Sequence, residues 1–427
     1  MALAVEFYKE FGDLGYLANY SNHGFIKNKV FYKTVEHFYQ SEKFSNKDLK
    51  SKIINCDTPK EASNIGRDRN NIRVNDFTSK KINVMREGVY LKFSQNSDIR
   101  SKLIETGNRK IKEMSLKESY WGVGPLKHGE NNIGLILMSV RDQLKLELRD
   151  KIISKCKGKK VYVIGHKKPD CDSVFSSVIL TRVLNKMGVN AVCAVRDKNF
   201  VDYDLINDYT DEDVCEINNY NNKSFILVDH NNLDGIDNKN VIGSFDHHRI
   251  SGEVEDLIEI EYASTCLLIY DLFKDIYHFT NDDKLLIGLS VLSDTEFLTS
   301  SRFSSYDRKL YNELGLDLDI DYLKKKYLTI NNNLDDIESN FKYDYKEYNY
   351  NGKVIHRCLI KSYSSDRELY MDKYISLMKK NKINLLIWCD YQDKSTYICF
   401  KDLKFKFIYF TTSTYLVLDY LTKMRYL

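Results

Sequence analysis

The stretch VYVIGHKKPDCDSVFSSVILTRVLNKMG, residues 161–188, indicates the fold of the central part of the chain. A short apolar run ends in His166, a polar turn follows, and an amphipathic segment then runs to a stop at Gly188. Two further apolar runs of the same kind are SFILVDH (224–230) and VIGSFDHH (241–248). Because short apolar strands alternate here with a helical segment, we expect a parallel α/β sheet.

Polar side chains close each of these apolar runs, and open α/β sheets bind ligands at the carboxyl ends of their strands. LSDT (292–295) is interpreted as the end of another such strand. Carboxylates and imidazoles suit manganese, magnesium or iron better than zinc, and two such ions could clamp a phosphoryl group and activate water. One strand-end aspartate is usually a cap or turn residue, but four clusters with the same ligand chemistry favour a metal site. The candidate residues are His166, Asp170, Asp172, Asp229, Asp246, His247, His248 and Asp294.

The order of these motifs is similar to that of a known family. H-x-x-P-D-x-D-S, L-V-D-H-N, D-H-H and L-S-D-T resemble the DHH phosphoesterases, most closely their manganese-dependent inorganic pyrophosphatase and exopolyphosphatase branch. The resemblance is strong over 159–310 and weak over 330–427, and EYASTCLLIYDL (261–272) looks like a helix of that branch. It implies a site for two divalent ions, with manganese first and magnesium or iron as alternatives. His166 and Asp170 would hold one ion, and Asp172 and His247 would hold the other. Asp229 and Asp294 would bridge both ions.

The resemblance also implies roles around the ions. Asp246 would orient a ligand histidine, while His248 would contact the phosphate and could donate a proton. The tail resembles the DHH-associated domain that closes over the phosphates, with Lys346 as its phosphate-binding lysine. The chain departs from the branch at its last residues, LTKMRYL, where an S-R-K-K-type motif is missing and Lys423 and Arg425 are either stand-ins or plain surface charges. Fewer cations favour a substrate of lower charge density than pyrophosphate, such as a nucleotide-type diphosphate diester.

A second constellation lies near the N-terminus. Glu36, Gln40 and Lys43 fall on one face of a helix expected over 34–45, where a carboxylate and an amine could serve acid/base chemistry and capture of an electrophile. The alternative is a salt bridge on the helix surface. Three further segments favour a site: NIGRDRN (64–70), a glycine turn with two arginines suited to phosphate; KESYWGVG (117–124), a stacking platform for a flat base; and HGENNIG (128–134), a polar loop before the strand-like LILM (135–138).

Together with YLANYSNH (16–23), KFSQN (92–96) and LIETGNRKIKE (103–113), these segments resemble the NADAR family across 5–145. That family cleaves N-glycosidic bonds, and includes enzymes of riboflavin-pathway intermediates and others that remove ADP-ribose from modified guanine. The resemblance implies catalytic roles for Glu36, Lys43 and Glu118. The implied substrate contacts are Arg67 and Arg69 on phosphate, Trp121 near the base, and Asn19 and Asn131 along the pocket. The family commonly has Asp at position 118 and Arg at position 132, where this chain has Glu and Asn; these departures bear on the substrate more than on the reaction.

The length of 427 residues predicts two or three domains. We expect an α/β multidomain protein: a mainly helical α+β domain at 1–150, a parallel-sheet α/β domain at 159–310 and a small mixed α/β domain at 330–427. A helix over 143–160 would lead out of the first domain into a short linker, with the boundary near 150–158. After Asp294 a charged helical stretch is expected over 307–340, and in the tail a helix over 365–381.

The composition limits the partners and the cell compartment that we expect. The formal charge of +3 gives no support for bulk nucleic-acid binding, and the nine cysteines form no C-x-x-C pair, which favours free thiols in a reducing compartment. The early acidic residues predict no signal peptide, and no apolar run is long enough for a bilayer, so we expect a soluble cytoplasmic protein. The expected partners are a small nucleotide or phosphate substrate and, in one interpretation, ADP-ribosylated nucleic acid. No membrane partner is expected, and a homo-oligomer is left open.

Three hypotheses of function follow. The first is a bifunctional hydrolase, in which an N-glycosidase and a two-metal phosphohydrolase act on related compounds and ADP-ribose is the simplest molecule that links them. The second keeps the activities independent, with inorganic pyrophosphate or short polyphosphate as the substrate of the phosphohydrolase. The third treats the N-terminal domain as an ADP-ribose-binding module without turnover.

Overall fold

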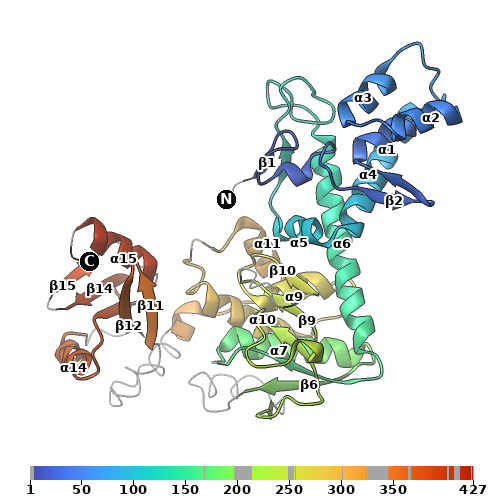
Figure 1. Cartoon of the computed structure of the whole chain (residues 1–427). Helices are drawn as coiled ribbons and strands as arrows, with labels where there is room; N and C mark the ends of the chain where they lie inside the picture. The colour runs from blue at the N-terminus through green and yellow to red at the C-terminus, as the bar shows by residue number, and fades with distance from the viewer. Residues whose placement is uncertain are drawn as a thin grey trace. The chain divides into compact units, whose positions relative to one another are not determined.

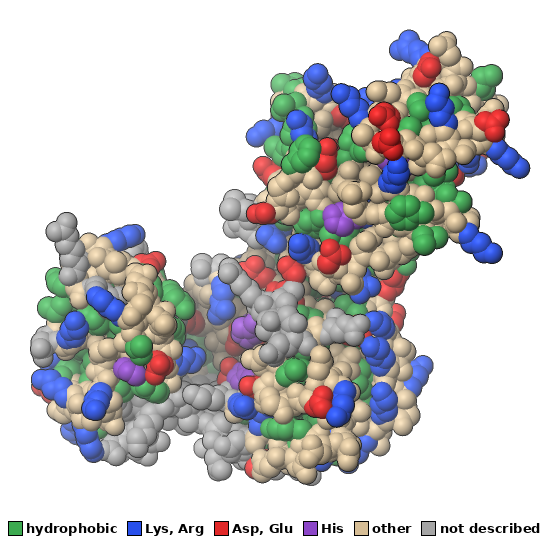
Figure 2. Space-filling view, in the orientation of Figure 1, with side chains coloured by type: hydrophobic (Ala, Val, Ile, Leu, Met, Phe, Trp, Pro, Cys, Tyr) green, Lys and Arg blue, Asp and Glu red, His purple; other side chains and the backbone are tan. Residues whose placement is uncertain are grey.

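The computed structural model describes residues 4–167, 169–196, 214–248, 254, 256–300, 302–324, 345–363, 367–401, 403–407, 414–424 and 426, without the side chains of 367–369. The chain divides into two compact units, Met1–Asp197 with Glu212–Leu314, and Lys198–Asp211 with Gly315–Leu427. Both are drawn in Figure 1. Figure 2 shows acidic and basic side chains interspersed on both units, which agrees with the formal charge of +3.

The N-terminal part of the first unit is mainly helical. Its helices are α1 (Val35–Ser41), α2 (Lys47–Ile54), α3 (Pro59–Arg67), α4 (Phe77–Gln95) and α5 (Ser97–Glu105). Its short strands pair β1 (Val5–Phe7) with β4 (Ile111–Glu113) in parallel and β2 (Phe25–Lys27) with β3 (Val30–Tyr32) antiparallel. The Thr34 side chain accepts a hydrogen bond from the His37 backbone N–H, which caps α1 at the expected start. The helix ends at Ser41, so Lys43 lies just beyond it rather than within the expected 34–45 helix.

Helix α6 (Asn132–Cys156) corrects one expectation and confirms another (Figure 1). LILM (135–138) is helical and not a strand, whereas the helix expected over 143–160 is present as far as Cys156. The buried residues of α6 recur at helical spacing from Ile133 to Ile153, whereas a four-residue apolar window cannot distinguish strand from helix. After the helix ends at Cys156, β5 already begins at Lys160, with Gly158 in the left-handed region between them.

The rest of the first unit contains a six-stranded sheet in which every neighbouring pair is parallel, which confirms the expected parallel α/β fold. The strand order is β10-β9-β8-β5-β6-β7. The strands are β5 (Lys160–Ile164), β6 (Asn190–Val195), β7 (Cys215–Glu216), β8 (Ser224–Val228), β9 (Val241–Asp246) and β10 (Leu257–Glu259). The helices are α7 (Cys171–Lys186), α9 (Thr265–Phe273), α10 (Asn281–Asp294) and α11 (Ser305–Glu313), of which the first three pack on one another.

Asp294 was expected at the end of a strand and instead ends helix α10. The apolar run LLIGLSVL before it is buried, and a short buried run reads equally well as either element. The distinguishing signal lies upstream, where Thr280 and Asp283 form a reciprocal capping box that starts the helix. The expected charged helical stretch over 307–340 is interrupted, because α11 ends at Glu313 and helix resumes at 320–324; residues 325–344 lie outside the described part of the chain.

The second unit is a small mixed α/β structure, as expected. Its sheet has the order β11-β12-β13-β14-β15, formed by Tyr345–Tyr350, Lys353–Ser362, Leu385–Asp390, Ser395–Phe400 and Leu403–Phe407. Helix α14 (Arg367–Lys380) connects the parallel pair β12 and β13, and α15 (Thr414–Lys423) follows the sheet. Trp388 and Tyr374 are fully buried in its core. Lys423 ends α15, and Arg425 lies outside the described residues.

All nine cysteines are free. Within the described residues, none of the helices has the length and apolar character that crossing a membrane requires.

Candidate active sites

Glu36 and Lys43 lie buried in the N-terminal part of the first unit, with 6% and 7% of their surface exposed. This burial argues against the alternative of a salt bridge on the helix surface. The Gln40 side-chain amide donates to Glu36 Oε1 at 2.7 Å. The Lys43 ammonium donates to the Gly66 carbonyl at 3.3 Å and lies 5.2 Å from the centroid of the Tyr39 ring.

Burial shifts both groups toward their neutral forms. It raises the pKa of Glu36, although the Gln40 hydrogen bond and the charge of Lys43 oppose the rise. It lowers the pKa of Lys43 to about 8, although the charge of Glu36 acts the other way. Shifts that favour the neutral forms of a buried acid and a buried amine are typical of catalytic groups.

The two expected arginines lie beside α1 on and after α3, and both are exposed. Arg67 is the last residue of α3, and its charge acts on Glu36 and on Lys43. Gly66 was expected in a turn but lies inside this helix. A Cβ at Gly66 would lie 1.9 Å from Gln40 Oε1, so glycine is required for α3 to pack against α1.

A third arginine, Arg73, was missed by sequence reasoning. Its guanidinium donates to the Gly66 carbonyl at 3.2 Å, beside the contact of Lys43 with the same oxygen. Its charge helps to lower the pKa of Lys43, after burial. No motif marked it, because it lies beyond the NIGRDRN segment in an irregular stretch.

An aromatic wall stands next to these groups. The Trp121 ring lies 5.6 Å from Tyr39 and 5.0 Å from Tyr120, centroid to centroid, and is nearly perpendicular to both. Glu118 is exposed on the same loop, and its charge contributes to the raised pKa of Tyr39, after burial and the charge of Glu36. The structure therefore gathers the expected base platform and the expected helix residues, although about 80 positions separate them in sequence.

Glu113, at the end of β4, is a third carboxylate of this site that sequence reasoning missed. Burial, followed by the charges of Glu118 and Glu36, raises its pKa to about 7. The available signal was weak: Glu113 is the last residue of the LIETGNRKIKE stretch and stands in no local motif.

The two expected pocket asparagines have different surroundings. The backbone carbonyl of Asn19 accepts a hydrogen bond from the Glu36 N–H. The Asn19 side-chain Oδ1 is buried without a hydrogen-bond partner, which leaves an acceptor for a ligand. Asn131 adopts φ +54° and uses its side chain on the backbone of β4. Its Oδ1 accepts from the Glu113 N–H at 3.0 Å, and its Nδ2 donates to the Ile111 carbonyl at 2.8 Å. Asn131 thus holds Glu113 in place.

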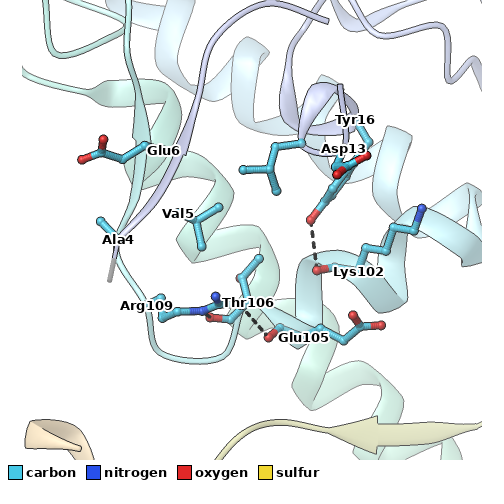
Figure 3. Close-up of a pocket in the computed structure, with 10 residues that line it drawn as sticks. Ala4, Val5, Glu6, Asp13, Tyr16, Lys102, Glu105, Thr106 and Arg109 are labelled. Atoms are coloured by element: carbon cyan, nitrogen blue, oxygen red, sulfur yellow. Dashed lines mark hydrogen bonds between the residues drawn. The ribbon is translucent and has the colours of Figure 1, made fainter. Parts of the chain in front are cut away.

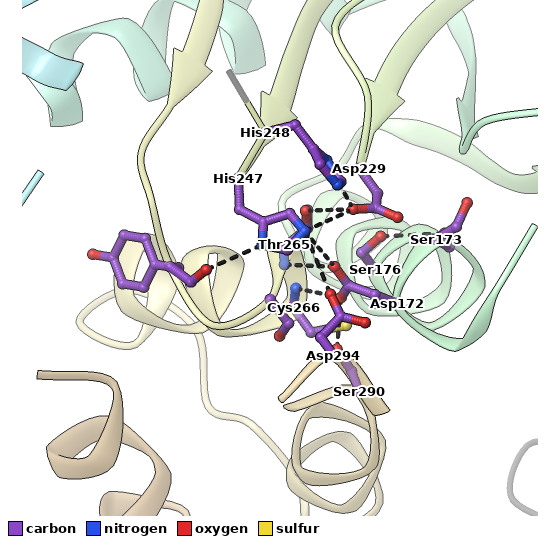
Figure 4. A network of polar contacts seen from close by, with 12 residues as sticks. Asp172, Ser173, Ser176, Asp229, His247, His248, Thr265, Cys266, Ser290 and Asp294 are labelled. Atoms are coloured by element: carbon purple, nitrogen blue, oxygen red, sulfur yellow. Dashed lines mark hydrogen bonds and ion pairs between the residues drawn. The ribbon is translucent and has the colours of Figure 1, made fainter. Parts of the chain in front are cut away.

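Figure 4 shows five of the metal candidates converging beyond the strand ends, namely Asp172, Asp229, His247, His248 and Asp294. Three groups of ligand atoms each lie within 4.8 Å of one another. They are His166, Asp170 and Asp229; Asp172, His247 and Asp294; and Asp229, His247 and His248. The first two groups bring together the residues expected around each ion, except that Asp294, expected on both, lies only in the second.

Asp229 lies between the two expected sites. It follows β8 in the left-handed region at φ +61° and is 2% exposed. Its Oδ2 lies 3.2 Å from His166 Nε2 and its Oδ1 lies 3.2 Å from His247 Nε2. One carboxylate oxygen therefore faces each group, as a bridging ligand requires. Asp294 joins only the second group, where its Oδ2 lies 3.4 Å from His247 Nε2.

His247 has the environment of a ligand. Its Nδ1 lies 3.0 Å from the Tyr262 carbonyl oxygen, so this nitrogen carries the proton and donates. Its Nε2 is buried, has no hydrogen-bond partner and faces three carboxylates. A backbone carbonyl that fixes the tautomer in this way is the usual support of a metal-binding histidine.

Asp172 is fully buried. Its carboxylate faces His247 and also accepts hydrogen bonds from three donors. Its Oδ1 accepts from the Cys266 N–H at 3.0 Å and from the Ser290 hydroxyl at 2.6 Å. Its Oδ2 accepts only the Thr265 N–H, at 2.7 Å, and retains a lone pair toward His247 at 3.7 Å. These donors, from the start of α9 and from α10, orient the carboxylate.

Asp246 was expected to orient a ligand histidine, and its contact is with His248. The Asp246 Oδ1 accepts the His248 N–H at 3.0 Å and lies 2.8 Å from His248 Nδ1. His248 has a side chain that is 52% exposed, so its other ring nitrogen is accessible to a ligand.

The charges of this cluster fit divalent cations. Burial, followed by the charge of a neighbouring carboxylate, raises the pKa of both Asp172 and Asp294. Burial lowers the pKa of His166, but Asp170 and Asp229 outweigh it and raise the value to about 10, so the position favours positive charge. Buried carboxylates are costly unless they are paired or bind a metal, and oxygen with imidazole donors suits manganese, magnesium or iron.

Lys346, the expected phosphate lysine, lies exposed on β11 in the second unit. It is directly opposite Arg357 of β12, whose guanidinium donates to the Tyr348 hydroxyl at 3.0 Å. Its role toward a phosphate stays a prediction.

A cavity of about 760 Å³ lies elsewhere in the N-terminal part of the first unit (Figure 3). Tyr16 donates its hydroxyl across it to the Lys102 carbonyl at 3.1 Å. The lining residues are Ala4, Val5, Glu6, Asp13, Leu14, Tyr16, Lys102, Glu105, Thr106 and Arg109. None of the ten was expected as a site residue.

Comparison with known proteins assigns the N-terminal part. Residues 6–145 match the NADAR domain. An N-glycosidase of Nostoc punctiforme is 37% identical over 146 residues, which cover 34% of this chain and 94% of that protein. The chain belongs to the NADAR family. The NADAR domain is also 31% identical to N-glycosidase YbiA of Escherichia coli over 143 residues, or 34% of this chain and 89% of that protein.

Residues 160–292 match the DHH family, N-terminal domain. A crystal structure of a putative family II inorganic pyrophosphatase from Methanococcus jannaschii is similar at 18% identity, with 59% of this chain and 95% of that chain covered and a TM-score of 0.45. The NMR structure of E. coli YbiA covers 34% of this chain and 86% of its own, at 30% identity and a TM-score of 0.33.

The chain therefore joins a NADAR domain to a DHH domain, as the sequence predicted. The names of the relatives confirm hydrolase chemistry at the level of the family.

Proposed function

We propose that the chain is a bifunctional hydrolase, with an N-glycosidase site in the NADAR domain and a two-metal phosphohydrolase site in the DHH domain. The observation that carries the proposal is the presence, in one compact unit, of a carboxylate and amine pocket and a separate cluster of aspartates and histidines. The proposed boundaries are 1–150, 159–310 and 330–427, with the last part closing over phosphate through Lys346. We place the activity in the cytoplasm, in line with nine free thiols.

In the NADAR domain, water adds to the anomeric carbon as the bond from that carbon to the base nitrogen breaks. Charge builds up positively on the ribosyl group and negatively on the departing base. Glu36 stabilises the ribosyl charge and takes up the proton that the added water loses, and Glu113 or Glu118 delivers the proton that the base takes up. Trp121 stacks on the base, Arg67 and Arg69 contact phosphate, and Asn19 offers its buried acceptor. We assign Lys43 to the ribosyl group, where its lowered pKa suits an amine that meets an electrophile.

In the DHH domain, His166 and Asp170 would hold one divalent ion, and Asp172, His247 and Asp294 would hold the other. Asp229 would contribute one carboxylate oxygen to each. When bound, such ions supply Lewis-acid stabilisation of a phosphoryl group and activate water. His248 has a defined part of its own: Asp246 fixes its Nδ1, so its exposed Nε2 can contact the phosphate and hold or deliver a proton. Manganese is the proposed ion, with magnesium and iron as alternatives.

ADP-ribose is the proposed compound that links the sites. The NADAR site would release it from an ADP-ribosylated base, and the DHH site would add water across its diphosphate to give AMP and ribose 5-phosphate. Two other proposals compete. The DHH site could act independently on pyrophosphate or short polyphosphate, or the NADAR domain could bind ADP-ribose without turnover.

Incubation of the purified full chain with ADP-ribose and manganese tests the link. We expect AMP from wild type and from Glu36→Gln, and none from Asp229→Asn. No AMP from wild type refutes the coupling. Phosphate release from pyrophosphate that far exceeds AMP release supports the independent activity. In a second assay with ADP-ribosylated guanosine, binding by wild type and by Glu36→Gln without release of the base by either supports the binding module.

A further inference from the structure

The NADAR domain and the DHH domain meet along α6, within the first unit. Arg149 on this helix is 7% exposed, and its guanidinium donates to the Leu272 carbonyl of α9 at 2.6 Å. The same guanidinium lies 5.6 Å from the centroid of the Phe273 ring. Helix α6 is continuous through Cys156, so the residues that make this contact lie on the same helix as the last part of the NADAR domain.

One turn earlier, Lys145 reaches Asp271 of α9. The Lys145 Nζ lies 3.6 Å from Asp271 Oδ2, with only 10% and 6% of the two side chains exposed. Lys145 is the last residue of the NADAR match, so this domain supplies a cation to a carboxylate of the next one. Of the groups that hold the pKa of Asp271 down against burial, the charge of Lys145 is the largest.

Asp271 in turn holds Tyr262. The Tyr262 hydroxyl donates to Asp271 Oδ2 at 2.5 Å, and the Tyr306 hydroxyl and Lys274 ammonium contact the same carboxylate at 3.1 Å and 3.0 Å. Tyr262 is 3% exposed, so its ring and its backbone are confined together. Its carbonyl oxygen is the acceptor that fixes Nδ1 of His247.

We propose that Lys145 is a positioning residue for the DHH metal site, acting through Asp271 and Tyr262 on His247. The inference rests on the proposed function in one respect, that His247 binds a metal ion. Without Lys145, fewer cations compensate the buried charge of Asp271, so this carboxylate must rearrange its contacts. The rearrangement reaches Tyr262, because the Tyr262 hydroxyl donates to Asp271. Through Lys145, the NADAR domain then contributes to the metal affinity of the phosphohydrolase site.

A matched control lies on the same helix. Lys151 and Lys155 contact Asp256 at 2.6 Å and 2.5 Å, across the same domain contact. The Asp256 backbone carbonyl accepts a hydrogen bond from the Ser244 N–H of β9, so its contacts run to β9 and not to Tyr262. Lys151→Met therefore removes an interdomain charge while leaving the support of His247 intact.

The experiment is manganese binding to the full chain, measured from the electron paramagnetic resonance of free manganese. We expect Lys145→Met to weaken one of two sites by about tenfold, the low end for loss of support behind a ligand, while Lys151→Met matches wild type. Lys145→Arg, which keeps the charge, should restore the affinity. Tyr262→Phe, which removes only the hydroxyl, should weaken the same site if Lys145→Met folds poorly.

Each outcome decides the question. Unchanged affinity in Lys145→Met and Tyr262→Phe overturns the proposal, and equal weakening in Lys145→Met and Lys151→Met replaces it with a general effect of domain docking. If wild type binds no manganese, the proposed phosphohydrolase function fails and the positioning role fails with it. N-glycosidase activity retained in Lys145→Met shows that the NADAR domain itself is intact.

Discussion

Replacing Glu113 with Gln should make the NADAR domain more stable at alkaline pH and leave it nearly unchanged at acidic pH. Burial and the charges of Glu118 and Glu36 raise the pKa of Glu113 from 4.5 to about 7. Its folded-state pKa thus lies above its unfolded value, and the folded chain binds the extra proton between the two. The stability that this proton confers is full below pH 4.5 and is lost as the pH rises through about 7.

The magnitude follows from the shift. At about 1.4 kcal/mol per pKa unit, the rise to about 7 corresponds to a loss of about 3 kcal/mol at pH 8 relative to pH 4, as an upper limit, because part of the carboxyl still contacts solvent. Glutamine has nearly the same shape and no charge to bury. The free energy of unfolding of Glu113→Gln should therefore exceed that of wild type by up to about 3 kcal/mol at pH 8 and by much less at pH 5.

Urea unfolding measures this difference. Trp121 reports on the NADAR domain, and a Trp388→Phe background silences the other tryptophan, which lies in the second unit. The exposed Glu130→Gln serves as the control, since water screens its charge at both pH values. A gain for Glu113→Gln that is the same at pH 5 and pH 8 would refute the reasoning, because it would show that the burial of a charge does not limit stability there.

Three further predictions concern activity and packing. Glu36→Gln should lower N-glycosidase kcat by at least about a hundredfold while manganese-dependent phosphate chemistry persists; loss of both in parallel assays would contradict separate sites. Asp229→Asn should weaken both manganese sites in a binding titration, because one carboxylate faces both ligand groups; weakening of a single site would contradict the bridge. Gly66→Ala should cost about 1–3 kcal/mol in thermal unfolding and lower N-glycosidase activity, since its Cβ would displace Gln40 from Glu36; unchanged stability would contradict that packing.

The metal cluster was largely predictable because its signals are local. His166, Asp170 and Asp229 each follow an apolar strand within a few residues, and parallel strands bring their carboxyl ends to one edge. Asp294 was placed correctly in the cluster but on the wrong element, since a buried apolar run does not reveal its period. The prediction of a strand at LILM (135–138) was wrong for the same reason, because this apolar run lies within α6.

The parts that sequence could not supply depend on long-range contact. The pKa of Glu113 is raised by burial first, and then by carboxylates that are distant in the chain or on another loop, and nothing at its own position indicates either. Lys145 and Asp271 are 126 positions apart, and a lysine in a charged helix reads as a solvated residue until the helix is docked. Glu113, Lys145 and Asp271 differ from the many surface residues of the same types in how little of the side chain is exposed, which the sequence does not show.

The central claim is that one chain carries two hydrolytic sites that act in sequence. The most direct measurement is product chromatography after incubation of ADP-ribosylated guanosine and manganese with wild type, Glu36→Gln and Asp229→Asn. We expect guanosine and AMP from wild type, no release from Glu36→Gln, and accumulation of ADP-ribose without AMP from Asp229→Asn. AMP from Asp229→Asn, release of ADP-ribose by Glu36→Gln, or no release by wild type would contradict it.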